Sequence, residues 1–581
     1  MNLPEFLRAA AAATARMTRE QLAGFIHQQA RQLPGERRAQ FLAALREELP
    51  EEVPEEAAIP DCSGLPDILR RIAGGEICLV GELNEAYDDW YGSDENEFLI
   101  EDPHDIAGTV RRSIDAVHQA VNAGAYEDAL QMAQQILELS ITVEGEYTDY
   151  TDDPFDIDDI AAYGLLPDYG ALLHRLFMDA LVAIYFFRTG EERCAELFRL
   201  FNSYAGENAL SLEDVLSASP RELPDFPTFL PQWAEYLGGK TGRTSDRLMA
   251  EASQLLEDRE AQMSMARRFA NTHPGLYERM LRNNPNGMED GRLLSLGQEA
   301  LREIRPDIRL RSRVALLTAA CALRLNDRDE AERCWLEALR SDPTATNYLR
   351  VCVESRDTAR GLEAAHGICG QYHEGRKRFD DSRLYDESES AVFRLSNSMR
   401  CSLAFLEHDF SFVQKRGMSV KEGLGWSSTF AKTGIALFLL YLYQGDALDK
   451  GTGQLCAAAA SATEFSEDRY FDGLPPEAAE SGASVFWRIF RVWRAAQNRT
   501  EQEQDSLLRE MERLVDLRLE GIMAANRRNY YAECAMYVAG LAEVKASRGE
   551  VSGKQDVLCV YKERYSRRRA FHQELRNFGM K

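Results

Sequence analysis

Residues 312–345 of this 581-residue chain read SRVALLTAACALRLNDRDEAERCWLEALRSDPTA. The stretch is rich in Ala, Leu, Glu and Arg, which have high helix propensity, and these residues are plentiful along the whole chain while Pro is scarce. No strand-type alternation of useful length appears, which argues against the parallel-sheet folds that host most nucleotide chemistry. We therefore predict an all-α protein, and the question becomes whether its helices form a bundle or a stack.

The same stretch resembles a tetratricopeptide repeat (TPR), a 34-residue helix–turn–helix unit. Ala319 matches the small site of the first helix, Ala331, Trp335 and Ala338 match the hallmark sites of the second, and Pro343 matches the terminal proline. The resemblance implies that the first two alanines are small because two antiparallel helices touch backbone to backbone there. It also implies that the tryptophan fills the space between successive units.

Weaker copies flank this unit. Residues 292–306 resemble a second helix of the repeat, residues 118–139 have the spacing of its turn, and residues 355–372 and 526–544 keep only the helical Ala spacing. Ala322 departs from the pattern, because the family usually has an aromatic residue there. We predict an irregular TPR-like α-solenoid of stacked antiparallel helix pairs; the alternative is an irregular stack of helical hairpins with one chance match.

Proline clusters and charge divide the chain into five predicted regions. They are a small N-terminal helical unit (1–48), in which Thr18 and Gln21 suit a capping box, a Pro-rich linker (49–65), an acidic helical-repeat region with two acidic loops (66–265), the clearest TPR-like repeats (266–350), and C-terminal helical repeats with a basic terminal helix (351–581).

Charge is distributed unevenly along the chain, whose formal net charge is −27. Residues 81–160 carry 22 Asp and Glu against two Arg, whereas residues 526–581 carry twelve Lys and Arg against six acids. The acidic half attracts basic partners and repels nucleic acid. The eleven cysteines are scattered without any CxC or CxxC pair, which is typical of a reducing compartment, so we expect a cytoplasmic protein.

Two acidic stretches are the candidate sites. Residues 84–105 hold nine carboxylates without one Lys or Arg, and residues 144–159 hold eight more. Neither fits the spacing of an EF-hand loop, so they are weak candidates for a metal site. The candidate ligands are Asp88, Asp94, Asp149 and Asp153.

Aromatic residues lie among these acids, and an apolar anchor with a charged rim is typical of interaction surfaces. The alternatives are a solvated loop, or rings that merely fix the loops onto the helices. The candidate partner-binding residues are Tyr87, Asp88, Asp89, Trp90, Tyr91, Glu95, Glu97, Tyr147, Asp152 and Asp153.

The C-terminal tail places Lys562, Arg564, Arg567, Arg568 and Arg569 along one predicted helix. Arg567 and Arg568 are further candidate partner-binding residues, although these cations also suit a charged cap on the end of the helical stack. The tail from residue 526 onward is similar to the helical tail of bacterial SWIM zinc-finger proteins. The CxC…CxH metal motif of those proteins is missing here, so their zinc function is not implied.

These observations favour an interaction protein over an enzyme. We expect a cytosolic helical-repeat scaffold or adaptor that binds a basic protein or peptide and contacts no membrane, because the two most apolar segments, 171–187 and 434–443, are interrupted by polar residues or too short. No cofactor is expected. The alternatives are a metal-dependent hydrolase built on the acidic loops, or a nucleic-acid-linked regulator acting through the basic C-terminal helix, although the acidic charge argues against nucleic acid.

Overall fold

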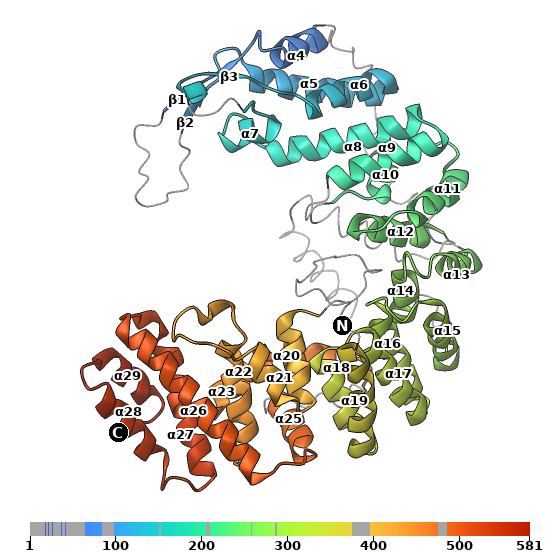
Figure 1. The fold of residues 1–581 in the computed structure, drawn as a ribbon. Coiled ribbons are helices and arrows are strands. Elements are labelled where there is room, and N and C mark those ends of the chain that lie inside the picture. The colour runs from blue at the N-terminus through green and yellow to red at the C-terminus, as the bar shows by residue number, and fades with distance from the viewer. Residues whose placement is uncertain are drawn as a thin grey trace, which may run out of the picture. The chain divides into compact units, whose positions relative to one another are not determined.

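The computed structural model describes residues 64–83, 98–149, 153–204, 209–256, 258–284, 288–374, 395–474 and 485–580, together with Thr18, Gln21, Ile26, Arg37 and Phe41. Over these residues the prediction of an all-α protein is confirmed (Figure 1). Compact units span Met1–Asp67 and Ile68–Lys581. In the first, Gln21 N donates to Thr18 Oγ1 (3.2 Å) and Thr18 N donates to Gln21 Oε1 (3.1 Å), so the predicted capping box is confirmed.

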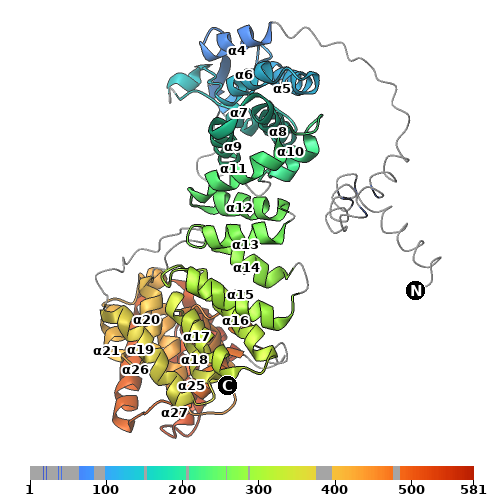
Figure 2. The same ribbon diagram turned by 90° about the vertical axis from the view of Figure 1, so that its right-hand side faces the viewer.

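Helices follow one another through the second unit (Figure 2). Those before residue 260 are α4 (Leu65–Ala73), α5 (Ile106–Ala123), α6 (Tyr126–Leu137), η1 (Glu146–Asp149), α7 (Ile157–Ala162), α8 (Tyr169–Phe187), α9 (Gly190–Ser203), α10 (Leu212–Ala218), α11 (Phe226–Gly238) and α12 (Arg243–Leu255). Next come α13 (Arg259–Arg268), α14 (Gly275–Asn283), α15 (Asp290–Glu303), α16 (Arg311–Arg324), α17 (Arg328–Ser341), α18 (Ala345–Glu354) and α19 (Thr358–Glu374). The last are α20 (Asn397–Leu406), α21 (Phe410–Arg416), η3 (Trp426–Ser428), α22 (Ala431–Leu442), α23 (Lys450–Ala462), α24 (Glu467–Phe471), α25 (Val485–Ala495), α26 (Glu501–Ala524), η5 (Arg528–Tyr530), α27 (Tyr531–Ser547), α28 (Lys554–Arg564) and α29 (Arg569–Asn577).

A small sheet near the start of this unit was not predicted. Strand β1 (Leu79–Leu83) pairs antiparallel with β2 (Phe98–Glu101) and parallel with β3 (Val143–Gly145). Leu83 is opposite Phe98, so the first acidic stretch connects two paired strands, and its residues 84–97 lie outside the described residues. The strands are only three to five residues long, too short to show the alternation on which a sequence-based strand prediction rests.

Helices α16 and α17 occupy the stretch quoted above and pack on each other. Ala319, Ala331 and Ala338 are fully buried, and Trp335 is buried with its Nε1 donating to the carbonyl of Gly473 (3.2 Å). The small residues thus lie where two helices meet closely. The tryptophan contacts a segment that is 138 residues away in sequence.

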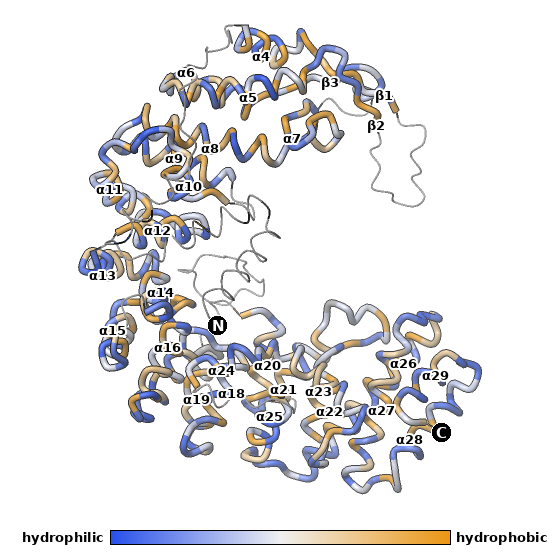
Figure 3. The backbone as a smooth tube through the Cα atoms, turned by 180° about the vertical axis from the view of Figure 1, so that it is seen from behind, coloured by the Kyte–Doolittle hydropathy of each residue, from blue (hydrophilic) through white to orange (hydrophobic). Residues whose placement is uncertain are grey.

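Two hydrophobic clusters form the core of the second unit. One contains buried residues from Leu69 to Cys321, and the other contains buried residues from Ala315 to Met580. Helix α16 contributes to both, and hydrophobic and hydrophilic residues alternate along most helices as expected for amphipathic packing (Figure 3). The apolar core therefore changes from one cluster to the other at α16, with Leu294 and Leu301 of α15 also packed against both.

Two local features were not predicted from the sequence. Residues 226–238 form one helix through Pro231, because burial of Trp233 and Leu237 on its apolar face offsets the roughly 3 kcal/mol cost of an internal proline. The serines and threonine at 427–429 do not cap α22, whose N-cap is Phe430.

The basic tail is also not one helix: it breaks between α28 and α29. Tyr561 is buried on the first helix and Phe571 on the second, so the chain turns between them to bury both rings. The turn is held by Arg568, which donates to the carbonyl of Met523 and to Asn526 Oδ1 at the end of α26.

Helix α8 is the one helix in the described part of the chain that is long and apolar enough, by length and composition, to cross a membrane. Most of it is buried in the core, including Leu176, Leu181 and Tyr185. Its buried Asp179 accepts a hydrogen bond from His118 Nδ1 (3.0 Å), and Arg175 forms an ion pair with Asp115. Both charged residues of this helix, Arg175 and Asp179, are thus paired within the fold.

Candidate anion-binding site

The described residues of the second acidic stretch mainly stabilise the sheet and its neighbours. Tyr147 is buried between Phe98 and Phe155, with ring centroids 5.1 and 5.3 Å apart, and its hydroxyl donates to the Asp153 carbonyl. Asp156 caps α7 through a capping box. Thus Tyr147 lies in the core, and Asp153 is exposed beside it.

The other candidate residues divide into three groups. Arg567 is exposed in the turn before α29, and Asp149 ends η1. Arg568 is engaged with α26, as described above. The following candidates lie outside the described residues: Tyr87, Asp88, Asp89, Trp90, Tyr91, Asp94, Glu95, Glu97 and Asp152. Among the described residues no group of three or more His, Cys, Asp or Glu side chains is arranged to hold a metal ion.

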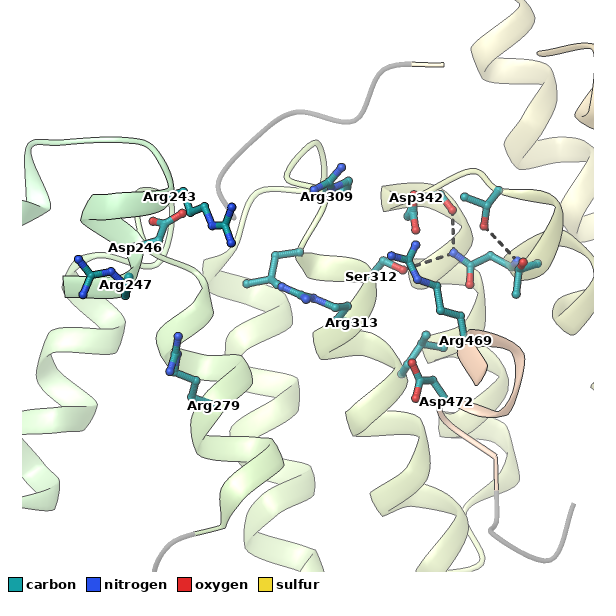
Figure 4. A pocket seen from close by; sticks show the side chains of 15 residues that line it. Arg243, Asp246, Arg247, Arg279, Arg309, Ser312, Arg313, Asp342, Arg469 and Asp472 are labelled. Atoms are coloured by element: carbon teal, nitrogen blue, oxygen red, sulfur yellow. Dashed lines mark hydrogen bonds between the residues drawn. The ribbon is translucent and has the colours of Figure 1, made fainter. Parts of the chain in front are cut away.

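A cavity of about 400 Å³ with six arginines is the most distinctive polar feature of the fold (Figure 4). We call it the arginine cavity. Its lining residues are Arg243, Asp246, Arg247, Arg279, Arg309, Leu310, Ser312, Arg313, Leu316, Asp342, Thr344, Thr346, Asn347, Arg469 and Asp472. Six guanidinium groups against three carboxylates make this a cationic hollow in a strongly acidic protein.

Three helices begin at the arginine cavity. Arg243 is the first residue of α12, Leu310 is the N-cap of α16, and Thr344 is the N-cap of α18. The first turn of a helix presents unpaired N–H groups and the positive end of the helix dipole. Two helices end there instead: α17 with Asp342 as its C-cap, and the five-residue α24 with Asp472 as its C-cap. The balance of helix ends therefore adds to the positive potential of the arginines.

Several of the guanidinium groups have few partners within the fold. Arg279, Arg309 and Arg469 form no side-chain hydrogen bond or salt bridge with another residue in the described ranges. Arg247 has its Nη2 buried without a hydrogen-bond partner there, and burial lowers its pKa although the carboxylates of Glu251 and Asp214 oppose the shift. An unpaired buried donor costs about 1–3 kcal/mol, which an anion in the cavity would relieve.

The three carboxylates neutralise less charge than their number suggests. Asp246 Oδ1 lies 2.7 Å from His273 Nδ1, and His273 Nε2 lies 2.8 Å from the Leu237 carbonyl. A carbonyl only accepts, so Nε2 carries a hydrogen, and a second proton must lie between Nδ1 and Oδ1. The Asp246–His273 pair is then neutral as a unit.

Asp342 is the second of these carboxylates. Burial raises its pKa to about 6, although the guanidinium groups of Arg469, Arg309, Arg350 and Arg313 act in the opposite direction. The side chain is partly buried, so its ionised form is less well hydrated than that of an exposed aspartate. Asp472, by contrast, is exposed.

Arg350 lies behind the lining of the cavity and holds one side of it in place. This fully buried residue of α18 donates from Nε to the Tyr470 carbonyl (3.0 Å) and from Nη2 to the Arg469 carbonyl, and its Nη1 donates to Asn347 Oδ1. Burial lowers its pKa to about 10, so the guanidinium is still charged at pH 7. It ties α24 to α18 and thereby places Arg469 at the cavity.

None of the cavity residues was predicted from the sequence. One signal was available: Arg243 is the first residue of α12, and Arg313 lies in the first turn of α16. A positive charge at these positions is disfavoured by about 0.3–1 kcal/mol. Residues that break a local rule are expected at functional sites. No family model, no curated protein and no solved structure matches this chain.

Proposed function

We propose that this protein is a helical-repeat scaffold or adaptor, of TPR-like solenoid type, which binds an anionic segment of a partner protein in the arginine cavity. The observation that carries the proposal is the convergence of six arginines and three helix starts on one hollow. The lining side chains are suited to holding an anion through charge and hydrogen bonds. We assign the protein to binding and not to catalysis.

Two further features support parts of this proposal. The buried alanines between α16 and α17 are those that a TPR-like packing requires. All ten cysteines in the described ranges are free thiols and nine of them are buried, which fits a reducing cytoplasm.

The acidic stretches retain a separate proposal. Residues 81–160 have 22 acids against two arginines, and this charge favours a basic partner, which would bind at a surface distinct from the arginine cavity. Eight of the ten candidate contact residues in the acidic stretches lie outside the described residues, so this second surface rests on composition alone.

Binding of a fluorescein-labelled peptide of eight Asp and Glu residues, followed by fluorescence anisotropy, tests the main proposal. We expect the peptide to bind, and the double variant Arg309→Ala/Arg469→Ala to weaken binding at least tenfold, about 1.4 kcal/mol. Both arginines are exposed, so their loss should change stability by no more than about 0.5 kcal/mol.

The matched control is Arg292→Ala, an exposed arginine on α15 that does not line the cavity. It should bind the peptide as the unmodified protein does. Equal loss in the control and the double variant, or no binding of any anionic peptide, would refute the proposal.

A further inference from the structure

We propose that the arginine cavity receives a phosphoryl group, carried by a phosphorylated Ser, Thr or Tyr in the bound segment. The inference rests on the proposed function and specifies the chemistry of the ligand. It would make the scaffold selective for the phosphorylated form of its partner.

The direction of the donors favours a tetrahedral anion. Guanidinium groups enter the cavity from α12, from α14 at Arg279, from the start of α16 and from α24 at Arg469 (Figure 4). A carboxylate has two oxygens in one plane, whereas a phosphoryl group has three terminal oxygens that point in different directions. Donors placed on four elements along the cavity are therefore better matched by the phosphoryl group.

Helix ends point to the same chemistry. The starts of α12, α16 and α18 all lie at the cavity, and these helices have 13, 14 and 10 residues, long enough for their dipoles to matter. Helix starts are common binding sites for phosphate. The first N–H groups of α16 already donate to the carbonyls of residues 308–310, so α16 contributes its dipole and not free donors. Together with the arginines they supply both hydrogen-bond donors and charge to one anion.

Three hydroxyl groups in the lining have unused donors. Thr346 Oγ1 accepts from Ser466 N (3.1 Å), Thr344 Oγ1 accepts from Asn347 N (3.3 Å), and Ser312 Oγ accepts from Asn347 Nδ2 (3.4 Å). Within the described part of the chain none of these hydroxyls donates to another group. A phosphoryl group accepts hydrogen bonds at all three terminal oxygens and would use these donors.

The charge balance also suits a dianion. The cavity has six guanidinium groups, and its Asp246 belongs to a neutral pair with His273. A phosphorylated side chain carries about −1.5 to −2 at pH 7, whereas one aspartate or glutamate carries −1. A phosphoryl group therefore compensates more of the cationic charge than a single carboxylate does in the same volume.

Two labelled peptides of equal charge test the inference at pH 7.5 and 150 mM NaCl. One has the sequence Gly-Ala-pSer-Ala-pSer-Ala-Gly, and the other has each phosphoserine replaced by Asp-Asp. We expect the phosphopeptide to bind at least tenfold more tightly, and the Arg309→Ala/Arg469→Ala variant to reduce this preference to less than threefold. Arg292→Ala should leave the preference unchanged, and thermal melting will show whether each variant is folded.

The outcomes separate the two proposals. Equal binding of the two peptides, lost in the double variant, would overturn the phosphoryl inference and leave the anion-binding scaffold standing. No binding of either peptide would overturn both. Inorganic phosphate and pyrophosphate are added as competitors, and displacement by either at a concentration below the phosphopeptide's Kd would show that a free phosphate compound, not a protein segment, is the ligand.

Discussion

Asp342 is the residue at which the fold and the arginine cavity conflict most directly. Burial raises its pKa to about 6 from an ordinary value of 3.8. Its carboxylate must be ionised at neutral pH in a place that favours the neutral form. Between about pH 4 and pH 6 the folded state therefore binds more protons than the unfolded state, so stability falls as pH rises through this window and stays lower above it.

Asp342→Asn should remove that loss. We expect the variant to be more stable than the unmodified protein at pH 7.5 by about 1–2 kcal/mol after solvent screening, and by about a third of that at pH 4.5, where the unfolded aspartate is already mostly ionised. Urea denaturation at the two pH values measures the difference. Asp472→Asn, at an exposed position of the same cavity, should change stability by less than about 0.5 kcal/mol at either pH. A variant less stable at pH 7.5 would mean that attraction by the arginines outweighs burial.

At the scale of the element, the α15–α16 contact depends on one glycine. A Cβ on Gly297 would overlap Thr318 Oγ1, and that hydroxyl is fixed by its hydrogen bond to the Val314 carbonyl (2.7 Å). The two helices approach as closely as they do because residue 297 has no side chain. On the same helix, Gly291 has open space around its Cβ position.

Gly297→Ala and Gly291→Ala should therefore have opposite effects. The first is expected to destabilise the protein by about 1–3 kcal/mol through overpacking, and the second to stabilise it by about 0.5–1 kcal/mol through helix propensity. Denaturation midpoints of the two single variants decide the matter. Equal and stabilising effects would show that α15 and α16 are not in close contact at this point.

The helices could be predicted because the residue pattern that indicates a helix is local in sequence. The cavity could not be predicted, since the residues that line it are far apart in sequence. The residues from 312 to 345 already contain both helices, their turn and their small contact residues. The sheet, by contrast, is formed by pairing Leu79 with Val143, and Trp335 meets Gly473. The cavity likewise combines residues from Arg243 to Asp472, which no sequence window brings together. Pairing at such separations depends on how the helices stack.

At the scale of the whole molecule, the two hydrophobic clusters meet at α16. On this helix Val314 and Cys321 belong to the N-terminal cluster, and Ala315 and Ala319 belong to the C-terminal one. Helical-repeat proteins are stabilised mainly by contacts between neighbouring units, so distant parts unfold together only as far as the units between them couple. Leu294 and Leu301 of α15 also pack against both clusters, so the connection consists of α16 and these two side chains.

We therefore expect two calorimetric transitions, and a matched pair of tryptophans assigns them. Trp233 lies in the N-terminal cluster and Trp493 in the C-terminal one; both are fully buried, and the indole N–H of each has no partner within the described ranges. Replacing either by Ala should cost about 3–5 kcal/mol. Trp233→Ala should lower the midpoint temperature of one transition, and Trp493→Ala should lower that of the other. Each variant should leave the midpoint of the remaining transition within about 2 °C, because the destabilisation of one cluster is not transmitted to the other through α16. A single transition lowered equally by both variants would show instead that α16 couples the two clusters into one cooperative unit. The residues of the arginine cavity come from both sides of that helix. The cavity would then be stabilised by the folding of the whole unit.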